Sequence, residues 1–227
     1  MGFLCVHPTR GGMKLKNGTT AAFRVIHVDN LEVYLARGAL HAANHVPADG
    51  RSWRSIHNVA VQGRRATTAV PLGPCGVMLD YLPFHFGPRN MFLYNLHTNH
   101  VQGVNFTDGQ TALITLVISV EAVVKAGHGF VFYDGHALSA LSTCYDTLSN
   151  LQRLDWTAID GNHWPDTEPE LKRCKQAEFM VHRVLPYAQV VGIAVCDDAA
   201  QQRVSTIQNT FPTPLHRPVA VRPRWYF

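Results

Sequence analysis

The sequence predicts a single mixed α+β domain in which helices separate six or seven strands. Apolar residues alternate along AFRVIHV (22–28) and QAEFMVHRV (176–184), and TALITLVISV (111–120) is a continuous apolar run; these patterns are typical of strands. Helix start and stop signals lie between these runs. Because hydrophobic residues make up 46% of the chain and no repeat or linker divides residues 21–227, we expect one folded domain there.

The N-terminal part combines a polar segment, a strand and a helix. Residues 1–20 hold several glycines and two lysines, so we expect them to form a flexible N-terminal arm. The strand at 22–28 is followed by a helix, for which Asn30 is a good N-cap and Gly38 a good stop.

The middle of the chain is less regular. Residues 44–65 have no clear period and predict a partly ordered surface element, and the sequence VPLGPCG at 70–76 predicts a turn. Within 78–96, Pro83 argues against a central strand, so we expect an edge strand or a loop that runs into a short helix. The long apolar strand that follows ends near Ser119, which is expected to cap a helix.

The C-terminal part predicts further strands. A strand is expected at 129–135, and 136–174 is expected to be a long helical and irregular segment with leucines at helical spacing. Strands at 176–184 and 189–196 follow, and after a short helix the last strand is expected at 218–223.

The cysteine and histidine patterns exclude several classes of site. The five cysteines form no CxxC pair, which argues against a disulfide framework and a thiolate zinc site. The thirteen histidines show no spaced ligand motif, so we expect no metal. The start MGFLCVHP lacks the pattern of a cleavable signal, so we expect none, and the longest apolar run has ten residues, too short to cross a bilayer. We expect a cytoplasmic protein without membrane association.

The charge balance leaves two interpretations open. The net charge is +4, with 15 arginines against 5 lysines. The planar guanidinium group suits phosphates and stacks on bases, so this bias fits a phosphate-rich partner such as nucleic acid or a dinucleotide. Ordinary surface solubility explains the charge equally well.

A carboxylate in a buried strand is the strongest candidate for chemistry. The phosphate-binding motifs GxxxxGK[ST] and GxGxxG and the nucleophile motif GxSxG do not occur. Glu178 lies in the middle of a largely apolar strand, with Gln176 on the same face, and a buried carboxylate is costly unless it is paired or functional. It could be a structural partner of Arg24 or Arg65. It could instead stabilise positive charge on a ribose during glycosyl transfer.

Seven segments of the chain, in order, form one set: FRVIHVDNL (23–31), RRATTAVP (64–71), GVMLDYLPFHF (76–86), FVFYDGHA (130–137), LQRLDWTAI (151–159), KQAEFMV (175–181) and RPRWYF (222–227). Together they resemble one family, the DarT toxins, which are DNA ADP-ribosyltransferases found beside a macrodomain antitoxin. The resemblance implies an ADP-ribosyltransferase fold, a split β-sheet sandwich with flanking helices and NAD+ in the central cleft. It implies transfer of ADP-ribose from NAD+ to a base, thymidine, in single-stranded DNA, by a bacterial toxin or phage-defence effector that acts as a monomer.

The resemblance also assigns roles to residues. Glu178 and Arg65 match the catalytic pair, segment 46–65 resembles the element that closes over NAD+, and 136–174 resembles the loop that presents the nucleic acid. Gln176 would position the acceptor. The NAD+-binding residues are expected to be Arg24, Val25, Ile26, His27, His41, Arg65, His85 and Phe86. The nucleic-acid-binding residues are expected to be His136, Arg153, Trp164 and Gln176.

Two departures from the family pattern concern the acceptor. Leu79 stands where the family often has His, and His85 stands where it has Tyr. Because both flank the cleft, base preference is the least certain part of the resemblance. The alternatives are a transferase of the same fold that acts on guanine, on RNA or on protein, and an inactive nucleic-acid-binding module.

Overall fold

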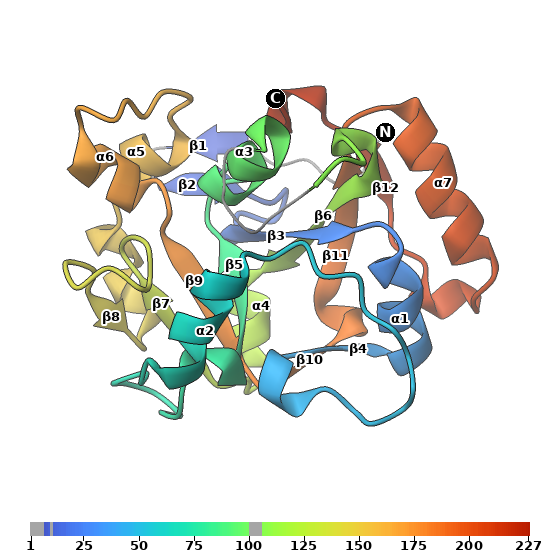
Figure 1. Ribbon diagram of the computed structural model, residues 1–227, viewed down its shortest axis with the longest axis horizontal. Helices are drawn as coiled ribbons and strands as arrows, with labels where there is room; N and C mark the ends of the chain where they lie inside the picture. The colour runs from blue at the N-terminus through green and yellow to red at the C-terminus, as the bar shows by residue number, and fades with distance from the viewer. Residues whose placement is uncertain (1–6, 10, 100–105) are drawn as a thin grey trace.

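An eight-stranded mixed sheet forms the centre of the molecule in the computed structural model, which describes residues 7–9, 11–99 and 106–227 (Figure 1). The strand order is β12-β11-β6-β3-β5-β9-β7-β8. Figure 1 places β12 and α7 at one end of the molecule and β8, α5 and α6 at the other. The strands are β3 (Ala21–His27), β5 (Tyr81–His85), β6 (Leu113–Ser119), β7 (Phe130–Tyr133), β8 (Cys144–Tyr145), β9 (Glu178–His182), β11 (Val190–Val195) and β12 (Val219–Val221).

The sheet is split between β3 and β5. β3 pairs with β6 along all of its length, and β5 pairs with β9 along all of its length, but β3 and β5 share only the pair Phe23–His85. The two half-sheets therefore separate beyond this pair. Pro83 lies on β5 within the separated part, and its carbonyl accepts a hydrogen bond from Arg24 Nη1 at 2.8 Å.

The prediction that β5 is an edge strand is wrong, because β5 lies between β3 and β9 in the interior of the sheet. The physical reasoning about Pro83 still holds. A residue without an N–H group is tolerated where one neighbouring strand has moved away.

Side-chain caps begin most of the longer helices. Asn58, Asn90, Ser119 and Asp197 each accept a hydrogen bond from a backbone N–H in the first turn of the helix that follows. The cap at Ser119 confirms the sequence prediction. The helices are α1 (Asn30–Arg37), α2 (Val59–Thr67), α3 (Met91–Thr98), α4 (Val120–Lys125), α5 (Trp156–Asp160), α6 (Pro169–Cys174) and α7 (Asp198–Asn209).

Asn30 does not cap α1, in contrast to the prediction. The N-cap is Asp29, and Asn30 is the first helical residue, buried, with its side chain bonded to a neighbouring segment. Its amide donates to the Arg54 carbonyl and its oxygen accepts from the Arg54 N–H, both at 2.8 Å. The Asn30 side chain thus ties segment 46–58 to the start of α1, and Gly38 ends the helix in the left-handed region, as predicted.

Apolar side chains cover both faces of the sheet. One cluster contains Ile26, Phe86 and Phe179, and a second contains Val25, Leu93 and Trp225. Short 3₁₀ turns join many elements: η1 (Ala43–His45), η2 (Met78–Asp80), η3 (Gln110–Ala112), η4 (Leu148–Arg153), η5 (Tyr187–Gln189), η6 (Thr213–Leu215) and η7 (Pro223–Trp225).

Residues 11–20 are not a flexible arm. β1 (His7–Thr9) and β2 (Gly12–Lys14) form a hairpin, and Met13 and Leu15 are buried in the second apolar cluster. Gly12 has a φ of 88°, and a Cβ there would overlap the Trp156 ring. The apolar residues between the glycines explain the error, because they anchor the segment to the domain. The earlier part of the predicted arm, residues 1–6 and 10, lies outside the described residues.

The segment 136–174 contains no long helix. It holds β8, η4, α5 and α6, and Leu141 is exposed instead of packing against a helical neighbour. Two short strands that sequence patterns did not indicate, β4 (Ala39–His41) and β10 (Val184–Pro186), pair with each other outside the main sheet. Among the described residues, no helix is long and apolar enough to cross a membrane.

Candidate active site

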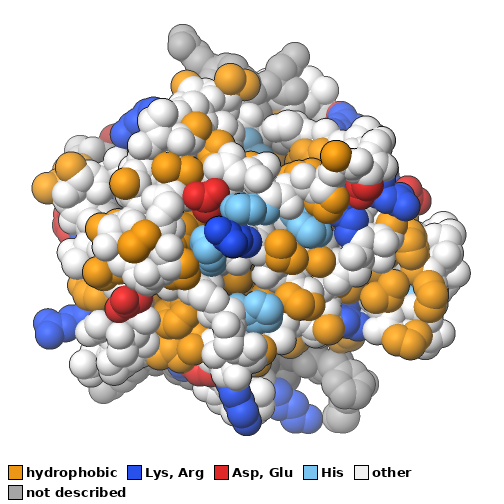
Figure 2. Space-filling view, turned by 90° about the horizontal axis from the view of Figure 1, so that it is seen from below, with side chains coloured by type: hydrophobic (Ala, Val, Ile, Leu, Met, Phe, Trp, Pro, Cys, Tyr) orange, Lys and Arg blue, Asp and Glu red, His pale blue; other side chains and the backbone are white. Residues whose placement is uncertain are grey.

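A cavity of about 360 Å³ lies where the two half-sheets separate. Its lining comes from β3, β5 and β9, from α2 and α3, and from the segments before α2 and after β7. This volume is within the range of small-molecule sites. Figure 2 shows histidine side chains gathered beside basic side chains on one face of the molecule.

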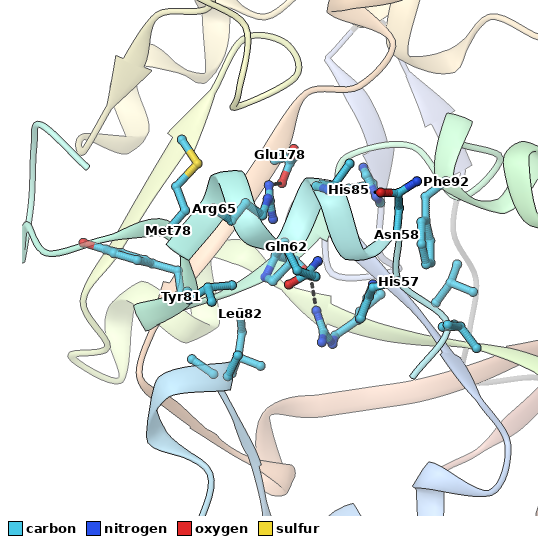
Figure 3. Close-up of a pocket in the computed structure, with 18 of the residues that line it drawn as sticks. His57, Asn58, Gln62, Arg65, Met78, Tyr81, Leu82, His85, Phe92 and Glu178 are labelled. Carbon is cyan, nitrogen blue, oxygen red and sulfur yellow. Dashed lines mark hydrogen bonds and ion pairs between the residues drawn. The ribbon is translucent and has the colours of Figure 1, made fainter. Parts of the chain in front are cut away.

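A buried ion pair joins helix α2 to strand β9 at the cavity. Arg65, in the last turn of α2, donates from Nη2 to Glu178 Oε2, and Figure 3 shows the two side chains pointing toward each other. The side chains are 7% and 3% exposed, respectively. Glu178 Oε1 also accepts from the Ala137 N–H at 3.3 Å. The structure therefore brings together the two residues expected to be catalytic.

The pair keeps Glu178 ionised. Burial is the largest single influence and raises the pKa of this carboxyl, but the Arg65 charge, the neighbouring histidines and the Ala137 N–H together lower it by more, so the pKa lies below its usual value. Glu178 therefore carries a negative charge at neutral pH on a side chain that is almost fully buried. Such a charge is suited to stabilising a positive charge that develops nearby.

Two neutral histidines form a wall of the cavity. His85 lies directly opposite Glu178 in the β5–β9 register, and burial lowers its pKa to about 4. Burial lowers the pKa of His57 to about 3. The Phe92 ring lies between them, stacked with His57 at 5.3 Å and with His85 at 6.5 Å between ring centroids. The rings present flat, uncharged faces to the cavity.

Arg24 supplies a positive charge at the separation of the half-sheets. Its side chain is largely buried and bonds the Pro83 carbonyl, and its buried Nε has no hydrogen-bond partner. The ion pairs found among the described residues do not include Arg24. A buried guanidinium without a carboxylate partner is suited to an anionic ligand group such as a phosphate.

Segment 46–58 closes one side of the cavity and is fixed at three places. Arg37 binds Asp49 through two parallel hydrogen bonds of 2.8 Å, and Trp53 packs on Tyr34. The Asn30 side chain holds the backbone of Arg54 as described above. This first part of the segment expected to close over NAD+ (46–65) is thus held against α1 beside the cavity.

The residues expected to bind NAD+ fall into two groups. Arg24, Val25, His41, Arg65 and His85 line the cavity. Ile26, His27 and Phe86 do not: the side chains of Ile26 and Phe86 lie in the apolar cluster, and His27 Nε2 lies 3.0 Å from Asp108 Oδ2. Successive side chains on a strand face opposite sides of the sheet, so Ile26 lies on the opposite face from Val25 and packs in the first apolar cluster.

The residues expected to bind nucleic acid are divided in the same way. His136 and Gln176 line the cavity, and Gln176 donates from Nε2 to the Lys172 carbonyl at 3.0 Å. Arg153 is exposed on η4, and Trp164 packs against Tyr94 and Phe227. The structure does not bring Arg153 or Trp164 into the cavity.

Several cavity residues were not predicted from sequence, among them His57, Gln62 and Phe92. A helical pattern starting at the cap residue Asn58 could have found part of this set, because Asn58, Val61, Gln62 and Arg65 share one face of α2. Phe92 comes from α3, and no local pattern links it to the cavity. Within the described part of the chain, no group of three or more potential metal ligands lies together.

Comparison with known proteins gives the family. The family model described as "ssDNA thymidine ADP-ribosyltransferase, DarT" matches residues 23–227. A DNA ADP-ribosyl transferase from Thermus sp. (strain 2.9) is 37% identical over 208 residues, covering 92% of this chain and 96% of that protein. One from Escherichia coli O127:H6 (strain E2348/69 / EPEC) is 30% identical over 208 residues, covering 90% and 92%.

The solved structures give the same result. Thermus sp. 2.9 DarT in complex with ADP-ribosylated ssDNA matches with a TM-score of 0.85 and 36% identity, covering 92% of this chain and 97% of that chain. The same protein in complex with NAD+ matches with a TM-score of 0.81 and 35% identity, covering 92% and 98%. The expected ADP-ribosyltransferase fold is confirmed, and the chain belongs to the DarT family of single-stranded-DNA thymidine ADP-ribosyltransferases.

Proposed function

We propose that this protein transfers ADP-ribose from NAD+ to a thymidine base in single-stranded DNA. The observation that carries the proposal is the buried Arg65–Glu178 pair at the cavity between the two half-sheets. Family membership supports the reaction class, and the solved complexes of the Thermus relative contain NAD+ and ADP-ribosylated ssDNA.

Glu178 is the central residue of the proposed mechanism. The bond between C1′ of the ribose and the nicotinamide nitrogen breaks, its electron pair leaves with nicotinamide, and positive charge builds on the ribose. The ionised Glu178 carboxylate stabilises this charge. A ring nitrogen of the base then forms the new bond to C1′, and its proton passes to the Glu178 carboxylate and from there to water.

Arginines provide the positive charges of the proposed site. The Nε–H of Arg24 has no hydrogen-bond partner among the described residues and is available to donate to the diphosphate of NAD+. Arg65 holds Glu178 in place and is positioned to polarise a carbonyl oxygen of the base. Its guanidinium does not act as a base, because arginine stays protonated at neutral pH.

A single strand suits this chemistry because a base-paired thymine has its ring nitrogen hydrogen-bonded to its partner. The loop after β7 borders the cavity through His136, which supports an acceptor site next to Glu178. We further propose that the protein acts as a cytoplasmic, monomeric toxin or defence effector, with a macrodomain antitoxin as its partner.

The acceptor class can be tested by competition. The protein is incubated with labelled NAD+ and equal amounts of single-stranded DNA, duplex DNA, RNA of the same sequence and a protein mixture. The proposal expects label on single-stranded DNA, and transfer that falls as salt rises, because phosphate contacts release counterions. If the label were found mainly on RNA or on protein, that class of molecule would be the acceptor instead of DNA. The absence of any NAD+ turnover would favour an inactive binding module.

A further inference from the structure

We infer that Arg173, on α6, is a positioning residue that holds the acceptor loop (residues 134–143) so that the loop presents a base to Glu178. The inference rests on the proposed function and extends it. Arg173 does not line the cavity, and its contribution acts through the loop.

A single guanidinium binds both ends of the acceptor loop. Arg173 Nη1 donates to Asp134 Oδ1 at 2.8 Å and to Ser142 Oγ at 3.1 Å. The backbone carbonyl of Arg173 accepts from the His136 N–H at 3.2 Å. The side chain is only 12% exposed, so these contacts are shielded from water.

The guanidinium is itself fixed by α6. Its Nε and Nη2 donate to the two oxygens of Glu170 at 2.9 and 2.6 Å. The Glu170 hydrogen bonds, followed by those of Asp134, raise the pKa of Arg173 despite partial burial. The Arg173 guanidinium is therefore charged and held in one orientation by Glu170. This fixed orientation reduces the entropy lost when the guanidinium forms its contacts with the loop.

Two features of the loop allow its backbone to pack directly against this guanidinium. Asp134 Oδ1 accepts from the Thr143 N–H at 2.9 Å, which closes the base of the loop. A Cβ at Gly135 would overlap the Arg173 guanidinium and would lie 2.8 Å from Ser142 Oγ. Only glycine at position 135 leaves room for the backbone to pack directly on the arginine.

The far side of the same loop contacts the catalytic residue. The Ala137 N–H donates to Glu178 Oε1 at 3.3 Å, and His136 lines the cavity. Arg64 Nη2, from α2, donates to the Leu138 carbonyl at 3.2 Å. A shift of the loop would therefore move His136 and Ala137 relative to Glu178.

A purely structural role for Arg173 predicts a different result from a positioning role. Loss of a structural ion pair lowers stability and affects NAD+ binding and base transfer alike. Loss of loop position leaves the NAD+ side of the cavity intact, because Arg24, Arg37 and His41 come from other elements. The distinguishing measurement is the effect on acceptor use compared with the effect on NAD+ affinity.

The test uses Arg173→Gln, with Arg173→Lys as the conservative variant and Lys172→Gln as the matched control. Lys172 lies on the same helix but pairs with the exposed Asp166. We measure the NAD+ Kd and kcat/KM for a single-stranded thymidine-containing oligonucleotide. Arg173→Gln should lower kcat/KM about tenfold to a hundredfold, with the NAD+ Kd within about twofold. Arg173→Lys should recover part of the loss, and Lys172→Gln should match the parent.

A kcat/KM of Arg173→Gln within about threefold of the parent value would overturn the inference. A loss of NAD+ affinity as large as the loss of transfer would also overturn it. Should Arg173→Gln fail to fold, Gly135→Ala provides the second test, because its Cβ pushes the loop and the Arg173 guanidinium apart without removing any charged group. It should show the same split between transfer and NAD+ affinity, and a parent-like result would reject the positioning role. A parent enzyme that modifies no oligonucleotide would instead reject the proposed function, and this inference with it.

Discussion

Arg65, on α2, and Glu178, on β9, are 113 residues apart in sequence and form a buried ion pair at the centre of the cavity. The structural and the catalytic interpretation of Glu178 are thus not exclusive, because the arginine that pairs with it also keeps it ionised. This relationship decides how each partner should respond to substitution.

Glu178→Gln should strongly slow transfer while leaving the fold and the NAD+ affinity in place. The amide keeps the shape of the side chain but cannot stabilise positive charge on the ribose. We expect kcat to fall about 10²–10³-fold with little change in the NAD+ Kd. Single-turnover kinetics measure the rate of transfer, and calorimetric titration measures the NAD+ Kd. Transfer within a few-fold of the parent rate would remove Glu178 from the catalytic role.

Arg65→Met should destabilise the protein, because it leaves the Glu178 carboxylate buried without its partner. The cost should be about 3 kcal/mol, the lower end for breaking a buried pair, since the cavity admits water. The double variant Arg65→Met/Glu178→Gln should recover part of this stability, because it removes the unpaired charge as well. Denaturant unfolding measures both. Equal stability of the parent and Arg65→Met would mean that the pair does not form in solution.

His85→Tyr should change the acceptor preference more than the NAD+ affinity. His85 faces Glu178 across the β5–β9 ladder and lines the cavity as a neutral ring, at the position where the resemblance to the family leads us to expect tyrosine. A phenol is larger and places its hydroxyl farther from the backbone. Transfer rates to oligonucleotides that differ only at the target and flanking bases test this. An unchanged order of these rates would show that His85 does not contact the acceptor.

The stability of the protein should fall as the pH drops from about 6.5 to about 4. The pKa of His85 is about 4 in the folded protein, whereas an unperturbed histidine has a pKa near 6.5. Between these values the unfolded chain binds more protons, so the free energy of unfolding decreases on acidification. Burial of His57 adds an effect of the same sign.

The matched variant for this pH effect is His85→Gln, which cannot titrate in either state. Its melting temperature should decrease less between pH 6.5 and 4 than that of the parent. A decrease as steep as in the parent would show that His85 is not buried and neutral in the folded state.

Glu178 could be singled out from sequence because a carboxylate within a buried strand is costly, and its presence there demands an explanation. Its assignment together with Arg65 as a catalytic pair came from the resemblance to the DarT family and stays a prediction. The strands with clear alternation or long apolar runs were predicted because burial on one or both faces leaves a local pattern. Residues that depend on tertiary contacts were not found. Phe92 enters the cavity only because α3 packs there, and His27 has a partner, Asp108, 81 residues away.

Errors arose where short-range features were given too much weight. Glycines and lysines in residues 11–20 suggested a flexible arm, although Met13 and Leu15 anchor that segment in the core. Leucine spacing suggested more helix in 136–174 than the structure has, because Asp134 accepts hydrogen bonds from the Thr143 N–H and from Arg173 that close part of that segment into a loop. Both outcomes depend on contacts with residues distant in sequence, which local periodicity does not contain.

Mass spectrometry of a single-stranded oligonucleotide incubated with NAD+ and the protein tests the central claim most directly. The account predicts that the oligonucleotide gains the mass of one ADP-ribose, that fragmentation places it on a thymidine base, and that the gain is absent with Glu178→Gln. An oligonucleotide of unchanged mass under conditions in which NAD+ binds, or a gain that persists with Glu178→Gln, would contradict it.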